Sequence, residues 1–322
     1  MTAEVTSQKR RNLLITAPRT ASSLLIRILN LDKQNVRPAH QGGYFFFPSV
    51  IGRVRLYGKP PKEWTPQEYA NVNELERHCL KNLQNHVEAS EAAGQRVYVK
   101  EHAGFLNSIY TDAEQMGGAP VEREPTYATQ SKLNLTCLPD EYLKTWHPTF
   151  LIRHPAMLIP SLYRTAQTGI KTDGAGRPTT EPLEQEGTMT VVRTLYDFYV
   201  EYFGESSEWP LILDADDVIT SPELMIKYAG LVGLDADKLQ FTWERMSKEE
   251  EARLMRPDRV MLGTINSSTG LIKEKAAGNI DIDAEAVKWR AEFGDAGGKK
   301  IERWVRQMMP DYEYMRSRRL TL

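Results

Sequence analysis

The chain has 322 residues, of which 41% are hydrophobic and 26% are charged, so it can bury a sizeable core. Its net charge of −2 gives no basic surplus for binding DNA, RNA or an anionic membrane as a main partner. The two cysteines, Cys79 and Cys137, are too few for a disulfide framework or a zinc site, and they fit a reducing compartment. No apolar run reaches about eighteen residues, the length that spans a bilayer. These totals predict a soluble, cytoplasmic protein.

Strand and helix patterns alternate along the chain. Residues 1–11 are polar and end in three basic residues, which predicts a flexible tail. Compact apolar runs predict strands that are buried on both faces, at 12–16, 96–100, 149–153 and 210–213. Helical patterns lie between and after them, at 22–31, 66–93, 156–166, 188–203 and 222–231. The alternation predicts an α/β fold with a parallel sheet, right-handed crossovers and a single domain over 1–322.

Long loops and a terminal helical region complete the predicted organisation. Residues 111–130 and 168–187 are rich in glycine and proline, which predicts loops. They follow strands, so we expect them to overhang the carboxyl edge of the sheet, where α/β proteins bind ligands. A charged helix is predicted at 247–255. Residues 284–322 predict a C-terminal helical region, with a helix over 284–309 that breaks at a glycine-rich stretch.

The first chemical signal follows the strand at 12–16. A tight turn carries Arg19 and leads into a helix that opens on Ser22 and Ser23. The N–H groups and the dipole of a helix start bind anions, and arginine and hydroxyl groups add further donors. A serine-capped helix beside a surface arginine is the structural alternative. The turn lacks the glycines and the lysine of a Walker A loop, which argues against Mg²⁺-dependent NTP hydrolysis.

The second signal lies at the end of the strand at 149–153. Arg153 ends this strand, Pro155 forces a turn, and Ser161 follows in the next predicted helix. A guanidinium and a hydroxyl could converge there on a second, separate phosphate. Taken alone, a strand-end arginine more often forms a salt bridge.

Together, these motifs resemble those of PAPS-dependent sulfotransferases. Residues 18–25 (PRTASSLL) are similar to the 5′-phosphosulfate loop of that family, and residues 150–164 to its 3′-phosphate motif. Residues 210–218 and 231–234 are similar to a later strand with an acidic pair and to the helix end that follows. The resemblance implies a three-layer, P-loop-kinase-like domain with a central parallel sheet flanked by helices, PAPS as donor, PAP as product, and no metal. It implies nucleotide binding by Arg19, Thr20, Ala21, Ser22, Ser23, Arg153 and Ser161.

The candidate catalytic residues Lys100, Glu101 and His102 close the second strand region. The strand period of two places Lys100 and His102 on one face. This pattern resembles the Lys-x-His element of the family, which implies that His102 takes the proton of the acceptor and that Lys100, with Arg19, steadies the transferring sulfonate. Histidine suits this task because its ordinary pKa lies near neutral pH. Glu101 is the alternative base, and a capping or surface histidine is the structural alternative.

Three features depart from the family pattern. Ala21 stands where the phosphate loop of the family has glycine. No aromatic residue aligns with the one that stacks on adenine, although the aromatic run at 44–47 could supply it or form a substrate-pocket wall. The late Arg-Lys-Gly loop has no match, and residues 267–270 followed by Lys273 and Lys275 stand in its place. The lid over the nucleotide is therefore unassigned.

These features predict a sulfotransferase that moves a sulfuryl group from PAPS to a hydroxyl or amine of a small, partly apolar molecule. A related activity would keep this first step and use the new sulfate as a leaving group in elimination or cyclisation. A third alternative is a catalytically silent PAP-binding protein. A kinase is disfavoured by the missing Walker residues. The expected partner is a small-molecule acceptor, with no nucleic acid and no membrane, and a homodimer is left open. We expect residues 103–137 and 168–190 to set the substrate range.

Overall fold

The computed structural model describes residues 10–39, 43–119, 121, 123, 130–169 and 180–322. Most of the predicted tail over 1–11 therefore lies outside the described residues, as do parts of the predicted loops at 111–130 and 168–187. Among the residues that are described, no helix combines the length and the apolar character needed to cross a bilayer.

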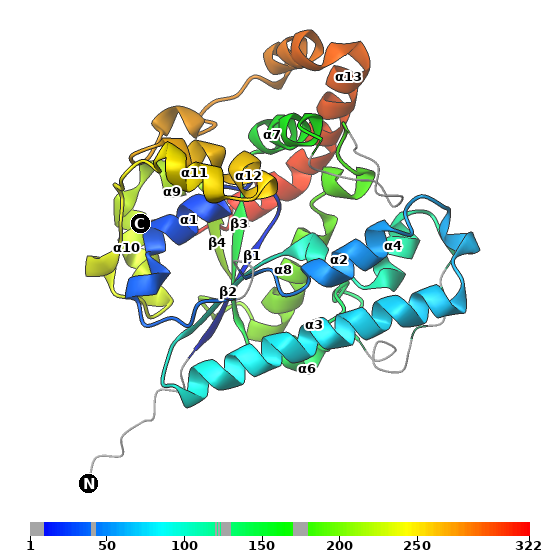
Figure 1. The fold of residues 1–322 in the computed structure, drawn as a ribbon, viewed down its shortest axis with the longest axis horizontal. Coiled ribbons are helices and arrows are strands. Elements are labelled where there is room, and N and C mark those ends of the chain that lie inside the picture. The colour runs from blue at the N-terminus through cyan, green and yellow to red at the C-terminus, as the bar shows by residue number, and fades with distance from the viewer. Residues whose placement is uncertain (1–9, 40–42, 120, 122, 124–129, 170–179) are drawn as a thin grey trace.

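A parallel sheet lies at the centre of the fold, as predicted (Figure 1). Its order is β2-β1-β3-β4, with β1 at Arg11–Thr16, β2 at Val97–His102, β3 at His147–Ile152 and β4 at Leu211–Asp214. Thr16 pairs with His102, and Ile152 pairs with Asp214, so the strands end at one edge. β2 runs two residues further than predicted, and Lys100 and His102 therefore both lie within it.

The two faces of the sheet carry separate apolar cores, which gives three layers. Leu13 and Ile15 of β1 face a core that α3, α7, α8 and α13 also form. Leu14, between them, faces a second core with residues of α1 and α10. Figure 1 shows α1 and α10 on one side of the strands and α3 and α8 on the other. This layering follows from strand alternation, because successive side chains point to opposite faces.

The helices have these bounds: α1 Ser22–Leu29, α2 Phe47–Val54, α3 Pro66–Ala92, α4 Ile109–Gln115, α6 Asp140–Leu143, α7 Pro155–Gln167, α8 Thr190–Phe203, α9 Ala215–Thr220, α10 Pro222–Leu231, α11 Lys248–Arg253, α12 Arg256–Ser267 and α13 Ile282–Arg316. Two short 3₁₀ turns matter for the site, η4 at Ala103–Phe105 and η7 at Lys273–Lys275. The long helix α3 begins as its sequence dictates, because Thr65 and Glu68 form a capping box around Pro66.

Two predictions about elements were wrong in part. The start of the predicted loop at 111–130 is helical, because α4 continues to Gln115. The terminal helix does not end at residue 309, since α13 continues through Pro310 to Arg316. Burial of Tyr312 and Met315 beyond the proline offsets the lost backbone hydrogen bond. The predicted break is confirmed at Gly294, whose φ of 75° bends the helix.

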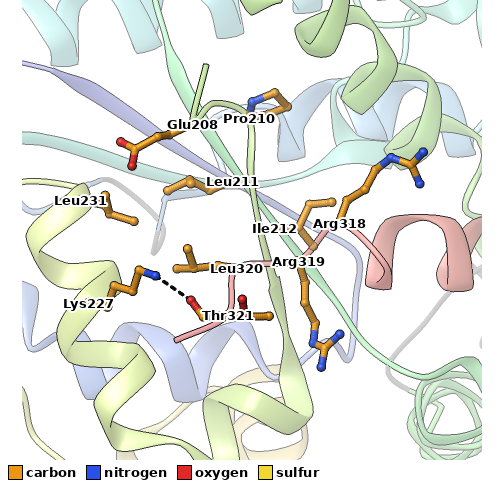
Figure 2. A pocket seen from close by; sticks show the side chains of 10 residues that line it. All are labelled: Glu208, Pro210, Leu211, Ile212, Lys227, Leu231, Arg318, Arg319, Leu320 and Thr321. Carbon is orange, nitrogen blue, oxygen red and sulfur yellow. Dashed lines mark hydrogen bonds between the residues drawn. The ribbon is translucent and has the colours of Figure 1, made fainter. Parts of the chain in front are cut away.

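The C-terminal tail returns to the first residues of β4. The N–H of Leu320 donates to Ile212 O (2.8 Å), and Lys227 Nζ donates to Thr321 O (2.7 Å). Figure 2 shows these residues lining a pocket together with Leu211, the first residue of β4. The pocket therefore lies near the amino end of β4, away from the edge where the motifs converge.

Candidate functional site

The turn between β1 and α1 shapes one wall of the site. Arg19 and Ala21 both have left-handed backbone conformations, with φ of 68° and 65°. The Thr20 hydroxyl donates to Ala17 O (2.8 Å) and closes the turn. Glycine adopts this conformation without steric cost, whereas a residue with a Cβ atom loses about 1 kcal/mol. Ala21 thus keeps the glycine conformation at a small cost in stability.

The structure brings Arg19, Arg153 and Ser161 together. Arg19 Nε donates to Ser161 Oγ (2.9 Å), and Arg153 Nη1 donates to Arg19 O (2.9 Å). The sequence predicted two separate anion sites, but these contacts join the arginine of the first motif to both residues of the second. Burial lowers the pKa of each guanidinium, and Arg19 lowers the pKa of Arg153 further through repulsion.

The hydrogen bonds of the two arginines go to neutral groups. Arg19 Nη1 donates to Met261 O (3.0 Å), and Arg153 Nη2 donates to Lys275 O (3.1 Å). Arg153 Nε is buried without a hydrogen-bond partner. In the described part of the chain, no carboxylate forms an ion pair with either guanidinium, although Asp216 and Asp214 raise the pKa of Arg153 from a distance. Two adjacent, half-buried cations without a paired carboxylate fit an anionic ligand.

The segment around η7 lies beside Arg153. Asp216 accepts hydrogen bonds from the N–H groups of Ala277 (2.7 Å) and Gly278 (3.0 Å) and so anchors the residues that follow η7. Arg153 contacts the same segment through Lys275 O. The segment that the sequence could not match to the late loop of the family therefore borders the two arginines.

His102 ends β2 with its ring fixed by Thr16. Its Nδ1 lies 2.6 Å from the Thr16 hydroxyl, which also lies 3.2 Å from Glu101 O. Where the hydroxyl donates its single proton to Glu101 O, it accepts a hydrogen bond from Nδ1–H, and the basic lone pair of the imidazole is then on Nε2. The side chain is buried, with 5% of its surface exposed. This arrangement suits a proton acceptor in a restricted site.

Lys100 lies on the same face of β2 as His102, as the strand period predicted. Its Nζ lies 4.3 Å from the centre of the Tyr44 ring, and 8% of its surface is exposed. Burial lowers the pKa of Lys100 to about 8, against the opposing effect of Glu101. The ammonium is therefore charged near neutral pH and poorly solvated, which strengthens its interaction with an anion.

Glu101 faces the opposite side of the sheet. Its carboxylate accepts hydrogen bonds from the N–H groups of Phe46 (3.1 Å) and His102 (3.0 Å). Burial raises the pKa of Glu101 to about 8, although these N–H groups favour the charged form. Glu101 thus fixes the backbone next to Tyr44 and at His102. Its side chain points away from the face of β2 that carries Lys100.

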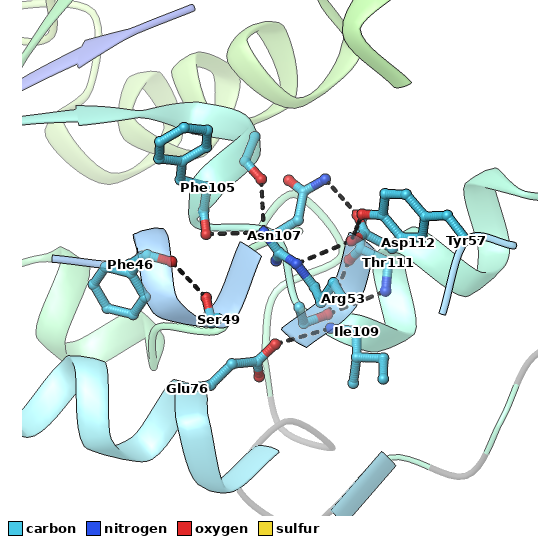
Figure 3. A network of polar contacts seen from close by, with 12 residues as sticks. Phe46, Ser49, Arg53, Tyr57, Glu76, Phe105, Asn107, Ile109, Thr111 and Asp112 are labelled. Carbon is cyan, nitrogen blue, oxygen red and sulfur yellow. Dashed lines mark hydrogen bonds and ion pairs between the residues drawn. The ribbon is translucent and has the colours of Figure 1, made fainter. Parts of the chain in front are cut away.

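Sequence reasoning missed the residues that support His102. Its ring centre lies 4.8 Å from that of Tyr44 and 4.9 Å from that of Phe105. Figure 3 shows the buried Arg53 of α2 behind η4, donating to Phe105 O (3.1 Å) and paired with Asp112 (3.1 Å). Charged residues in amphipathic helices are usually exposed, so the sequence carried no signal for this network.

The other predicted residues lie at helix starts. Ser22 is buried at the first position of α1, and Ser23 follows it. His154 caps α7, where its Nδ1 accepts a hydrogen bond from the N–H of Ala156 (3.1 Å). Burial lowers the pKa of His154, so it is a neutral, structural residue next to Arg153.

Comparisons with known proteins give two curated relatives over nearly the full chain. Sulfotransferase ppzF of Metarhizium rileyi (strain RCEF 4871) is 41% identical over 331 residues, which cover 96% of each chain. Sulfotransferase ppzF of Metarhizium majus (strain ARSEF 297) is 39% identical over 338 residues, which cover 98% of each chain. No protein-family model matches. Among solved structures, a sulfotransferase domain from the Synechococcus PCC 7002 olefin synthase is 12% identical with a TM-score of 0.40, and covers 89% of this chain and 96% of that domain.

Proposed function

This chain belongs to the sulfotransferase family, and we propose that it transfers a sulfuryl group from PAPS to a hydroxyl or amine of a small molecule. The observation that carries this proposal is the pair of adjacent, half-buried guanidiniums of Arg19 and Arg153, whose hydrogen bonds go to neutral groups. A ligand with phosphate groups would pair with both of them. PAPS has anionic groups at two positions of its ribose, and the donors of this site come from two motifs.

The hydrogen-bond donors of the site would bind the two ends of such a nucleotide separately. Arg153 and Ser161 would hold the 3′-phosphate, since Arg153 immediately precedes the turn into α7 and Ser161 lies within that helix. The start of α1, with Ser22 and Ser23, would receive the 5′-phosphosulfate through its N–H groups and hydroxyls. Arg19 lies between these ends, because its turn leads into α1 while its Nε contacts Ser161. Bound PAPS would supply the activated sulfuryl group.

The residues of β2 would carry out the transfer. His102 would accept the proton of the acceptor hydroxyl through Nε2 while the acceptor oxygen bonds to sulfur and the bond from sulfur to the phosphate oxygen breaks. Lys100 would stabilise the negative charge on the transferring group, because its ammonium is poorly solvated. PAP then leaves with the electron pair of the broken bond. The chain would act chiefly through positioning and charge, as in phosphoryl transfer.

Calorimetry with PAP tests the binding site. The protein should bind PAP without Mg²⁺ and more tightly than AMP, because AMP lacks the 3′-phosphate. Arg153→Ala removes a charged hydrogen-bond donor worth about 1.5–3 kcal/mol, so PAP affinity should fall roughly ten- to a hundredfold. Arg164→Ala is the matched control, since this exposed arginine of α7 pairs with Glu292 (2.6 Å). Equal PAP affinity of the wild type and Arg153→Ala would contradict the assignment.

Incubation with PAPS and a pool of hydroxyl acceptors tests the reaction. We expect release of PAP together with a sulfated product. Release of PAP with an unsulfated, rearranged acceptor would indicate elimination or cyclisation instead. Binding of PAP without any turnover, across a broad acceptor pool, would favour a silent nucleotide-binding protein.

A further inference from the structure

Tyr44 contacts both candidate catalytic residues of β2. The Lys100 ammonium lies over its ring, and the His102 ring lies against the same ring. The pKa of Tyr44 is raised by burial and by Glu101, whereas the Ser22 hydroxyl and the charge of Arg19 act in the opposite direction. One aromatic side chain thus packs against the ammonium of Lys100 and the imidazole of His102.

The backbone around Tyr44 is fixed to β2. Gly43 has a φ of 101°, and a Cβ atom there would lie 2.8 Å from Lys100 O, so only glycine allows this approach. The N–H of Phe46 donates to the Glu101 carboxylate (3.1 Å), and Ser49 Oγ donates to Phe46 O (2.8 Å). Tyr44 is therefore held against Lys100 by its neighbours on both sides.

We propose that Tyr44 is a positioning residue of the transfer reaction, whose ring holds the Lys100 ammonium in the site. This inference rests on the proposed function, because it assigns Lys100 to the transferring group. Ring faces attract ammonium groups most strongly where water is excluded, as it is around Lys100.

The charged groups near Lys100 explain why a ring is needed there. Glu101 is adjacent in sequence and raises the pKa of Lys100, but it lies on the other face, and burial keeps most of it protonated near neutral pH. His102 lies on the same face, and Arg19 lies on the neighbouring turn. Neither side chain supplies negative charge, because histidine is neutral or cationic and arginine is cationic. The electron-rich face of Tyr44 is the contact that stabilises the ammonium.

The pKa of Lys100, followed by NMR in protein with ¹³C-labelled lysine and assigned with Lys100→Arg, tests this role without any donor. Tyr44→Leu removes the ring and should lower this pKa by about one unit. In turnover assays, its rate should decline at correspondingly lower pH on the alkaline side, with kcat at pH 8 reduced about fivefold. Tyr44→Phe keeps the ring, so the pKa of Lys100, kcat and KM for PAPS should all stay close to wild type.

Tyr202→Leu is the matched control, since the Tyr202 ring lies 6.0 Å from Lys144 on the exposed surface, and it should leave Lys100 and kcat unchanged. An unchanged or raised pKa of Lys100 in Tyr44→Leu overturns the inference, even if the wild type turns PAPS over. If Tyr44→Leu does not fold, Tyr44→Met decides, because an unchanged pKa of Lys100 in this variant, which also lacks the ring, overturns the inference. A wild type without PAPS turnover overturns the proposed function and this positioning role together, whatever the NMR result.

Discussion

His102 is held in one orientation by residues from three segments. Thr16 fixes Nδ1 from β1, Tyr44 contacts the ring from the aromatic run, and Phe105 packs edge-on from η4. A catalytic base needs such restraint, because a small displacement of the accepting nitrogen reduces the rate of proton transfer. The same contacts would also serve a histidine that only stabilises the fold, so function and stability have to be measured together.

Replacing His102 by alanine separates the two roles. If His102 is the general base, kcat should fall by roughly 10²–10⁴, while PAP affinity stays near wild type because proton transfer occurs only in the transition state. The wild-type rate should also fall toward acid pH, since only the neutral imidazole accepts a proton. Steady-state kinetics beside the melting temperature and PAP calorimetry provide the measurement.

His147→Ala is a suitable comparison, because His147 is the first residue of β3 at the opposite end of the sheet. It should retain full kcat in the folded fraction. A folded His102→Ala variant with near-normal kcat would assign the proton transfer to another group, either Glu101 or the acceptor itself.

At the scale of elements, the turn from β1 into α1 carries the main sequence departure. Ala21 precedes α1 with φ 65° and ψ 23°, and no side chain caps the helix start. The N–H groups of the first turn are therefore not used by a side-chain cap, which suits a helix start that receives an anion. The Cβ atom of Ala21 in this left-handed conformation lowers the free energy of unfolding.

Relieving this cost gives a prediction about stability. Ala21→Gly should raise the free energy of unfolding by about 0.5 kcal/mol, because the gain at a positive φ exceeds the extra entropy of glycine in the unfolded chain. Ala21→Val should lower it by more than about 1 kcal/mol, since β-branched residues avoid this conformation. Urea unfolding measures both.

Ala89→Gly, in the interior of α3, controls for the flexibility of glycine and should lower the free energy of unfolding by about 1 kcal/mol. If Ala21→Gly destabilises the protein as much as Ala89→Gly does, the left-handed conformation of Ala21 is contradicted.

At the scale of the whole molecule, Glu101 is an ionisable group buried within the layered core. It is 2% exposed, and its pKa is raised from 4.5 to about 8 mainly by burial. As pH rises above 4.5, the unfolded chain loses this proton while the folded protein keeps it until about pH 8. The unfolded state is thereby favoured, so the stability present at low pH is lost progressively over this range.

Glu101→Gln should remove this pH dependence, because the amide has no proton to lose. Its carbonyl oxygen replaces only one of the two carboxylate oxygens that accept from Phe46 and His102, and the resulting loss of stability is the same at every pH. Relative to wild type, its free energy of unfolding should increase by roughly 2–4 kcal/mol between pH 5 and pH 8. Urea unfolding at several pH values measures the difference. Glu201→Gln, on the exposed surface of α8, should show no such trend, and parallel curves for Glu101→Gln and wild type would refute the buried, protonated state of Glu101.

The sheet, most helices and the position of the motifs could be predicted from the amino-acid sequence. Four apolar runs and the helical patterns between them predict parallel strands, and parallel strands end at one edge, so Arg19, Lys100, His102 and Arg153 were expected there. The period of two also predicted that Lys100 and His102 share a face. These features depend on local periodicity and on the order of the elements along the chain, and both can be read from the sequence.

The contacts between distant side chains came from the fold. Arg19 and Ser161 are 142 residues apart, and their contact depends on how α12 and α7 pack around the strand ends. Tyr44 and Glu101 likewise acquire their neighbours from the path of residues 43–47 over β2, which the close approach of Gly43 makes possible. Such contacts arise from packing between distant segments, and because no local periodicity encodes that packing, the contacts of Arg19 with Ser161 and of Tyr44 with Lys100 could be read only from the folded chain.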